Sequence, residues 1–75
     1  MIRFRLKELL ADKSFREGRN VTLLEVAAQT NVARSTLNRI ANTRGYSTST
    51  DVIDKLCKYF NCRVEDLMQC EPDQE

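Results

Sequence analysis

The stretch Thr22–Asn42, TLLEVAAQTNVARSTLNRIAN, holds two short apolar patterns of helical period with a few residues between them. Thr22 is a favoured N-cap residue, and Glu25 three positions later predicts a capping box. Asn31 follows the first pattern and tolerates the left-handed conformation that often ends a helix. The stretch therefore predicts two helices joined by a short turn, at residues 23–29 and about 34–42.

The second of these helices is expected to be amphipathic. Four residues at helical spacing point inward: Val32, Leu37, Ile40 and Ala41. Four polar residues share the outward face: Arg34, Ser35, Asn38 and Arg39. Arginine can bond guanine at two atoms and asparagine can do the same with adenine, and a helix fits the major groove of DNA. The face therefore indicates DNA reading, while an ordinary helical hairpin with a polar surface is the alternative.

The rest of the chain also has a helical period. Ile2 to about Phe15 predicts a first helix with Leu6, Leu9 and Leu10 inward, and Gly18 breaks it. Ser49 or Thr50 caps a fourth helix that reads to about Phe60, and Val64–Met68 predicts a last short one. No segment shows strand-like alternation. The predicted fold is all-α, a compact bundle of five short helices in one domain over residues 1–70, with residues 71–75 as a frayed acidic tail.

Composition agrees with one small globular domain. The chain has 75 residues, of which 41% are hydrophobic and 31% charged, and its net charge is only +1. The charge is divided unevenly, because residues 1–46 carry a net +5 and residues 47–75 a net −4. A basic half can face phosphate while an acidic half faces solvent or a protein partner. An uninformative surface is the alternative explanation.

Several classes of function find no support in the sequence. No apolar run approaches the ~18–20 residues that span a bilayer, and the N-terminus has no signal-peptide h-region, so a cytoplasmic protein is expected. Three cysteines and no histidine make a disulfide framework or a metal site a poor fit, and Cys57 falls on an apolar helix face as a small hydrophobe. No catalytic set is present, so neither an enzyme nor a cofactor is expected.

The residues from Thr22 to Ile40 resemble the helix-turn-helix of the XRE family, the Cro and phage-repressor-like regulators. Ala27 matches the small residue where the two helices cross, and Asn31 stands where the family usually has glycine. Val32, Leu37 and Ile40 match the buried positions that hold the recognition helix. Similar segments lie upstream, at residues 5–11, and downstream, at residues 51–62 and 64–68. The resemblance covers roughly residues 3–69 and implies a lambda-repressor-like fold with the helix-turn-helix as helices two and three.

The resemblance also implies a function and a site. The protein would bind double-stranded DNA in a sequence-specific way, as a homodimeric transcription regulator, most simply a repressor, on a palindromic operator. Half-sites would lie about one helical turn, ~34 Å, apart. Base contacts would come from Arg34, Ser35, Asn38 and Arg39, and phosphate contacts from Thr22, Thr36, Arg44, Tyr46, Ser47 and Thr48. Arg3, Arg5 and Arg19 are expected on the solvated surface.

Three departures from the family pattern affect these expectations. Leu23 stands where the family often has a phosphate-binding glutamine. Ala33 replaces the usual Ser or Thr cap of the recognition helix, which costs about 0.5–2 kcal/mol of capping. The loop at residues 43–48 lacks the family's common proline.

The sequence allows alternative roles for several of these residues and a second function. Tyr46 can pack against the fourth helix instead of touching DNA, and Leu67 and Met68 can close the core instead of forming a dimer interface. A protein-interaction module or an antitoxin of the same fold is the second function that the sequence allows. Such a module would use the acidic C-terminal half to hold its partner.

Overall fold

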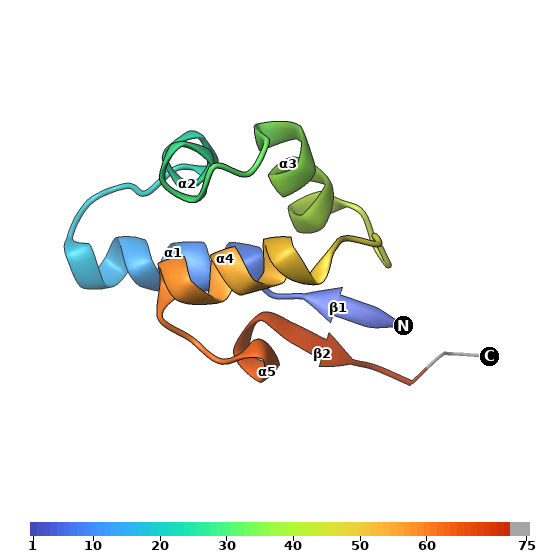
Figure 1. The fold of residues 1–75 in the computed structure, drawn as a ribbon. Helices are drawn as coiled ribbons and strands as arrows, with labels where there is room; N and C mark the ends of the chain where they lie inside the picture. Colours follow the sequence, from blue (N-terminus) through green and yellow to red (C-terminus); the bar gives the residue numbers. More distant parts are fainter. Residues whose placement is uncertain (73–75) are drawn as a thin grey trace.

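The computed structural model describes residues 1–72, which form five helices and a small sheet (Figure 1). Helices α2 and α3 form one layer, α1 and α4 lie beneath it, and α5 with the sheet forms the opposite side. The N-terminus and the end of β2 lie at the same end of the molecule. The elements are β1 (Ile2–Phe4), α1 (Leu6–Glu17), α2 (Leu23–Thr30), α3 (Arg34–Asn42), α4 (Thr50–Phe60), α5 (Val64–Leu67) and β2 (Met68–Cys70).

Local capping signals place the ends of α2 and α4. The hydroxyl of Thr22 accepts a hydrogen bond from the Glu25 N–H at 3.2 Å, and that of Ser49 accepts one from Val52 N–H at 3.2 Å. Both helices end at a left-handed asparagine, Asn31 with φ 60° and Asn61 with φ 53°. The two caps and the asparagine end of α2 were predicted from the sequence and are confirmed, apart from the second half of the capping box. The Glu25 carboxylate binds Arg19 instead.

The core is a single cluster of aliphatic side chains and one phenylalanine. Leu6, Leu37, Leu56 and Leu67 are fully buried, one each from α1, α3, α4 and α5. Burying a leucine side chain stabilises the fold by roughly 1.5–3 kcal/mol. The remaining core residues are Val21, Val26, Val32, Ile40, Ile53 and Phe60, and Leu9, Leu10, Ala41, Val52 and Cys57 are half-buried against them. Leu67 therefore closes the core.

The sheet corrects two sequence predictions. The first helix does not begin at Ile2, because Ile2–Phe4 forms β1, and the last helix does not include Met68, which begins β2. The two strands are antiparallel, and their partners are Ile2 with Cys70, Arg3 with Gln69 and Phe4 with Met68. Phe4 and Met68 pack against the core from the same side of this ribbon. The fold is thus mostly helical with one two-stranded ribbon, and not all-α.

The ribbon continues one residue beyond its strands. The Met1 amino group donates to the Glu71 carbonyl at 3.0 Å, and the Glu71 N–H donates to the Met1 carbonyl at 2.9 Å. Glu71 is thereby fixed, although the sequence placed it in a frayed tail. Residues 73–75 of that predicted tail lie outside the described residues. Over residues 1–72, no helix has the length and apolar character needed to cross a bilayer.

Candidate nucleic-acid interface

Helix α3 is held firmly on one side and exposed on the other. Leu37 and Ile40 are buried, while Arg34, Ser35, Asn38 and Arg39 are all exposed, as the sequence predicted. Val32 is also buried, in the three-residue turn that joins α2 to α3. The structure therefore brings the four predicted base-contact residues together on the outer face of α3.

Thr30 stabilises the turn before α3, a role that the sequence reasoning missed. Its hydroxyl donates to the Val26 carbonyl at 2.7 Å and accepts from the Val32 N–H at 3.4 Å. Thr30 is the buried polar residue of the core. A threonine at a helix end beside an otherwise apolar stripe is the signal that could have revealed it. The two bonds fix the turn, and hence the direction in which α3 leaves it.

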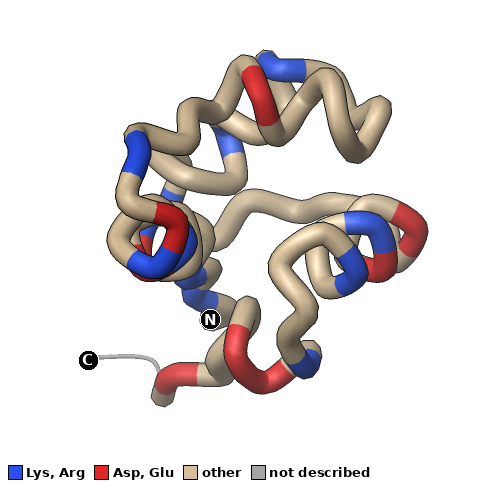
Figure 2. Tube along the Cα trace, turned by 90° about the vertical axis from the view of Figure 1, so that its left-hand side faces the viewer, with Lys and Arg blue, Asp and Glu red and all other residues tan. Residues whose placement is uncertain are grey.

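The arginines near α3 differ from most other basic residues in their surroundings. Residues 26–50 contain no aspartate or glutamate. Within residues 1–72, no ion pair involves Arg34, Arg39 or Arg44. Figure 2 shows both signs of charge intermixed on α1 and α4. Uncompensated positive charge is what a surface that binds a polyanion requires.

The charge division along the sequence proves less informative than expected, because basic residues of the N-terminal segment are mostly paired. Arg3 lies 3.5 Å from Glu8 and 3.3 Å from Glu71, and Arg5 lies 3.4 Å from Glu8. Within and beside α1 the pairs are Lys13–Glu17 at 2.6 Å, Arg16–Asp12 at 3.1 Å, Arg19–Glu17 at 2.8 Å and Arg19–Glu25 at 2.7 Å. The segment without acidic residues, and not the basic half, defines the positive surface.

Arg19 joins the end of α1 to the start of α2. Its guanidinium donates two hydrogen bonds of 2.7 Å to the two oxygens of Glu25 and one of 3.0 Å to Glu17. These bonds hold the pKa of the Glu25 carboxyl below its ordinary value of 4.5. Lys13, the partner of Glu17, also lies 4.9 Å from the centre of the Tyr59 ring on α4. The cluster thus links α1, α2 and α4.

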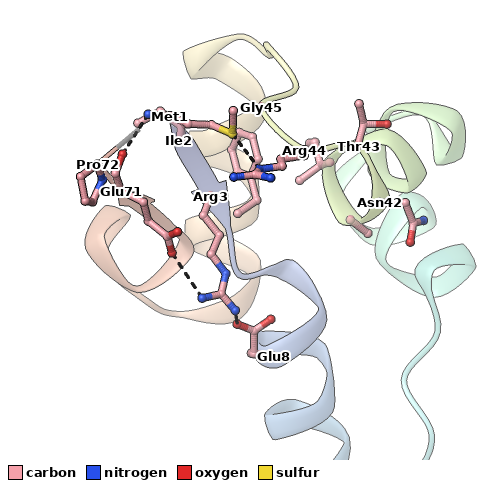
Figure 3. Close-up of a pocket in the computed structure, with 13 residues that line it drawn as sticks. Met1, Ile2, Arg3, Glu8, Asn42, Thr43, Arg44, Gly45, Glu71 and Pro72 are labelled. Carbon is pink, nitrogen blue, oxygen red and sulfur yellow. Dashed lines mark hydrogen bonds and ion pairs between the residues drawn. The ribbon is translucent and has the colours of Figure 1, made fainter. Parts of the chain in front are cut away.

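The predicted phosphate contacts lie at the edges of α2 and α3. Thr22 caps α2 and is exposed, Thr36 is half-buried in the first turn of α3, and Ser47 is exposed in the loop after α3. Arg44 is exposed, and its Nε donates to the Met1 sulfur at 3.1 Å (Figure 3). This weak acceptor leaves the cationic head of Arg44 without a carboxylate partner among the described residues.

Tyr46 and Thr48 are less accessible than the other predicted phosphate contacts. Both are half-buried, and Tyr46 packs against the core. They line a cavity of about 490 Å³ with Phe4, Ile53 and Met68. Tyr46 therefore packs against the core, which is the alternative to DNA contact that the sequence left open.

The start of α3 lacks a side-chain cap, as expected from the alanine at position 33. The Ala33 carbonyl accepts the first helical bond, from Leu37 N–H at 3.1 Å, and no side chain caps the turn. The N–H groups of residues 34–36 consequently have no helical acceptor. Leu23, another departure from the family pattern, is half-buried against the core and so serves packing.

The cysteines show no sign of a metal centre within residues 1–72, where no three potential ligands gather. Cys57 and Cys62 are half-buried and Cys70 is exposed. Burial, with Cys57 close by, raises the pKa of the Cys62 thiol to about 11. Cys62 is therefore a poor nucleophile and a poor metal ligand at neutral pH.

A compact helical domain that presents a rigid helix with an arginine-rich, uncompensated outer face has the features of a nucleic-acid-binding protein. Comparison with known families gives the class directly. The pattern of the Cro/C1-type HTH DNA-binding domain matches residues 5–73, and the chain belongs to this family. A search of curated proteins found no match.

Proposed function

We propose that the protein is a sequence-specific regulator of transcription that binds double-stranded DNA through α2 and α3 as its helix-turn-helix, with α3 in the major groove. The observation that carries the proposal is the outer face of α3. Arg34, Ser35, Asn38 and Arg39 are exposed together, and within residues 1–72 none of their side chains makes a hydrogen bond or an ion pair; only the backbone carbonyl of Asn38 accepts a bond, from the Asn42 side chain. Membership of the Cro/C1-type family supports the same function.

The chemistry of this face suits base reading. Arg34 and Arg39 can each make a two-point contact with guanine, and Asn38 can make one with adenine. Ser35, in the first turn, can contact either base or phosphate. The buried Leu37 and Ile40 fix the rotation of the helix, so these side chains project from a rigid support. Such preorganisation lowers the entropy lost on binding.

Phosphate contacts would flank this face and set its register. The uncapped N–H groups at the start of α3 can bond a phosphate oxygen directly, and Thr36 can add its hydroxyl. Arg44, Ser47 and Thr48 follow α3 in a loop without acidic residues, and Thr22 lies at the start of α2. Tyr46 could contact the DNA backbone only through the outer edge of its ring, since the ring packs against the core.

We further propose that two copies bind a palindromic operator and repress transcription by occluding the promoter. A single α3 covers only a few base pairs. A dimer must recognise two half-sites at once, so its selectivity is roughly the square of that of one half-site. Half-sites on one face of the duplex would be about 34 Å apart.

Selection of bound sequences from a random double-stranded DNA pool tests the proposal. The expected product is a motif with two inverted halves whose centres are separated by about 10 base pairs. Recovery of no enriched motif, at a salt concentration where the protein is folded and monodisperse, would overturn sequence-specific binding.

A second function, a protein-interaction module or an antitoxin, is favoured by one observation. Phe15 on α1 is 86% exposed and Leu24 on α2 is 61% exposed, and large apolar side chains on a surface often mark protein contacts. Binding to DNA depends strongly on salt, whereas an apolar contact with a protein does not. A partner captured through Phe15 and Leu24 with affinity independent of salt would support this alternative.

A further inference from the structure

The turn that ends α4 brings two cysteines together. The Cys62 N–H donates to the Cys57 carbonyl at 3.0 Å, and the Asn61 N–H donates to the Lys58 carbonyl at 3.3 Å. With Asn61 in the left-handed conformation, these two bonds form a Schellman motif, one of the common ways in which a helix ends. The first and last residues of this motif often make an apolar side-chain contact across the turn. In this chain both of those residues are cysteines.

The two thiols are neighbours in a half-buried setting. Both side chains pack against the core. Burial, and after it the nearness of Cys57, raises the pKa of the Cys62 thiol to about 11. A disulfide joins Cα atoms that are about 4.4–6.8 Å apart. One turn of an α-helix rises by about 5.4 Å, so two residues that close a single helical turn, as Cys57 and Cys62 do, fall within the spacing that a disulfide requires.

A small reagent can reach each sulfur by a separate route. Cys57 lines the cavity of about 490 Å³ that also contains Phe4 and Tyr46. Cys62 lines a second cavity, of about 440 Å³, together with Arg5. The two cavities share no lining residue. A structural zinc site needs four ligands, and within residues 1–72 no third ligand joins the pair. Oxidation is the chemistry that remains open to two adjacent thiols.

We propose that Cys57 and Cys62 are a redox modification site, at which the two thiols close a reversible disulfide between the end of α4 and the turn to α5. The oxidant would be a small disulfide of the glutathione type. Because Cys62 keeps its proton at neutral pH, Cys57 is the residue that reacts first. This inference is independent of the proposed function, since it concerns neither α3 nor DNA.

The reaction proceeds in two exchange steps. The Cys57 thiolate attacks one sulfur of the small disulfide, whose S–S bond breaks, and a first small thiolate leaves. Cys62 then gives up its proton and attacks the Cys57 sulfur of this mixed disulfide, which releases the second small thiolate. The two protons from the protein pass to the two released thiolates. One disulfide is thereby reduced to two thiols, while the protein dithiol is oxidised to one disulfide.

The new bond would affect the fold and not the DNA-binding face. It closes a short loop and so restricts the unfolded chain, which stabilises the folded state when the native geometry fits the bond. Figure 1 shows the junction of α4 and α5 on the side of the molecule away from the layer of α2 and α3. Oxidised and reduced protein are therefore expected to bind DNA equally well.

The test uses Cys70→Ser as the parent variant, because Cys70 is the exposed third thiol. Adding either Cys57→Ser or Cys62→Ser to it gives two matched controls with a single thiol each. Each folded protein is incubated with defined ratios of reduced and oxidised glutathione, and the products are measured by intact mass spectrometry. The parent is also incubated in urea. Far-UV circular dichroism verifies that each variant is folded before oxidation.

Peptide mapping locates the bond without ambiguity. Trypsin cleaves after Lys58, between the two cysteines, and so separates residues 56–58 from residues 59–63. A disulfide between Cys57 and Cys62 holds these two peptides together until a reductant is added. A non-reducing gel shows whether the linked peptides come from one chain or from two.

The folded parent is expected to lose two hydrogen atoms in mass, to remain a single chain and to give the linked peptides. Cys70→Ser/Cys62→Ser should stop at a glutathione adduct on Cys57. Because the fold holds the two sulfurs together, its disulfide should be favoured over glutathione by at least about tenfold more than in urea.

Three results would overturn the proposal. The first is a folded parent that keeps both thiols free, and the second is one that carries two glutathione adducts. The third is an equilibrium for disulfide formation that is no more favourable in the folded protein than in urea. Selection of a DNA motif does not depend on any of these results, so the site and the proposed function can fail separately.

Discussion

Arg19 and Glu25 form a two-point ion pair, in which both terminal nitrogens of the guanidinium lie 2.7 Å from a carboxylate oxygen. The pair fixes the loop between α1 and α2 to the first turn of α2, where Thr22 makes its cap. Arg19 is a basic residue close to the proposed DNA-binding helices, yet its charge is already matched by two carboxylates. Its contribution is expected to be to the fold.

The first prediction concerns pH. The bond from Arg19 lowers the pKa of Glu25, and those from Lys13 and Arg19 lower the pKa of Glu17. A depressed carboxyl pKa stabilises the fold above the ordinary value of 4.5, and this stabilisation is lost as pH falls below it. Arg19→Gln should therefore be less stable than wild type at pH 7, with a difference that shrinks toward pH 3.

Urea unfolding of both proteins at several pH values measures this difference. Lys7→Gln is the matched control, since Lys7 is exposed and has no carboxylate partner within residues 1–72. A stability difference for Arg19→Gln that stays constant from pH 7 to pH 3 would contradict the assignment.

The second prediction concerns base contacts. Arg34→Ala and Arg39→Ala should each weaken binding to the selected DNA by about 1–3 kcal/mol, roughly 5- to 150-fold, because each removes a two-point contact. Fluorescence anisotropy gives the affinity, and circular dichroism gives the helix content, which should not change. Arg16→Ala, which removes an exposed arginine of α1 paired with Asp12, should bind as wild type does. Equal affinity of all three variants would show that α3 does not read the bases.

The third prediction separates phosphate contacts from base contacts. Arg44 lies in the loop after α3 and has no carboxylate partner among the described residues. Arg44→Ala should weaken binding to specific and unrelated DNA alike, and should reduce the slope of log affinity against log salt by about 1. An unchanged slope, or a loss confined to the specific sequence, would remove Arg44 from the phosphate-contacting set.

The fourth prediction concerns the cap of α3. Ala33 has φ −58° and ψ 137°, an extended conformation that serine adopts without strain, and no side chain caps the helix. Ala33→Ser should therefore stabilise the protein by about 0.5–2 kcal/mol. Ser49→Ala, which removes the cap of α4, should destabilise it by a similar amount. Thermal or urea unfolding measures both, and a neutral Ala33→Ser would mean that the first turn of α3 is already satisfied.

The fifth prediction concerns the core. Leu37→Ala should destabilise the fold by about 2–5 kcal/mol, because Leu37 is fully buried where α3 meets the core. Leu24→Ala makes the same chemical change at a position that is 61% exposed, and should cost less than about 0.5 kcal/mol. Similar losses for the two variants would contradict the packing of α3.

The sequence predicted α2, α3 and α4 well because their signals are local. The hydroxyl caps Thr22 and Ser49 and the asparagine ends Asn31 and Asn61 each act within a few residues of the bond that they make. The four side chains on the outer face of α3 followed from the same period. A helix that is amphipathic and capped by its own neighbours needs no distant partner to define its ends.

The ribbon and the ion pairs could not be predicted in this way. Strands of three residues are too short to show alternation, and the partner of Ile2 lies at Cys70. Arg3 and Arg19 looked like solvated cations because their carboxylate partners are supplied by other elements. The positive surface around α3 was nevertheless visible in the sequence, as the absence of acidic residues from positions 26–50.

The ribbon has a consequence for how the protein is made. Its hydrogen bonds join residues 2–4 to residues 68–70, so they close a loop that contains nearly the whole domain. Contacts of such long sequence separation cost more loop-closure entropy than the local contacts within and between neighbouring helices. They therefore form late in folding. During synthesis α2 and α3 leave the ribosome before β2 does, and β1 has no partner strand until β2 follows. The domain is therefore completed only when β2 has emerged, and until then the ribbon that closes the fold is missing.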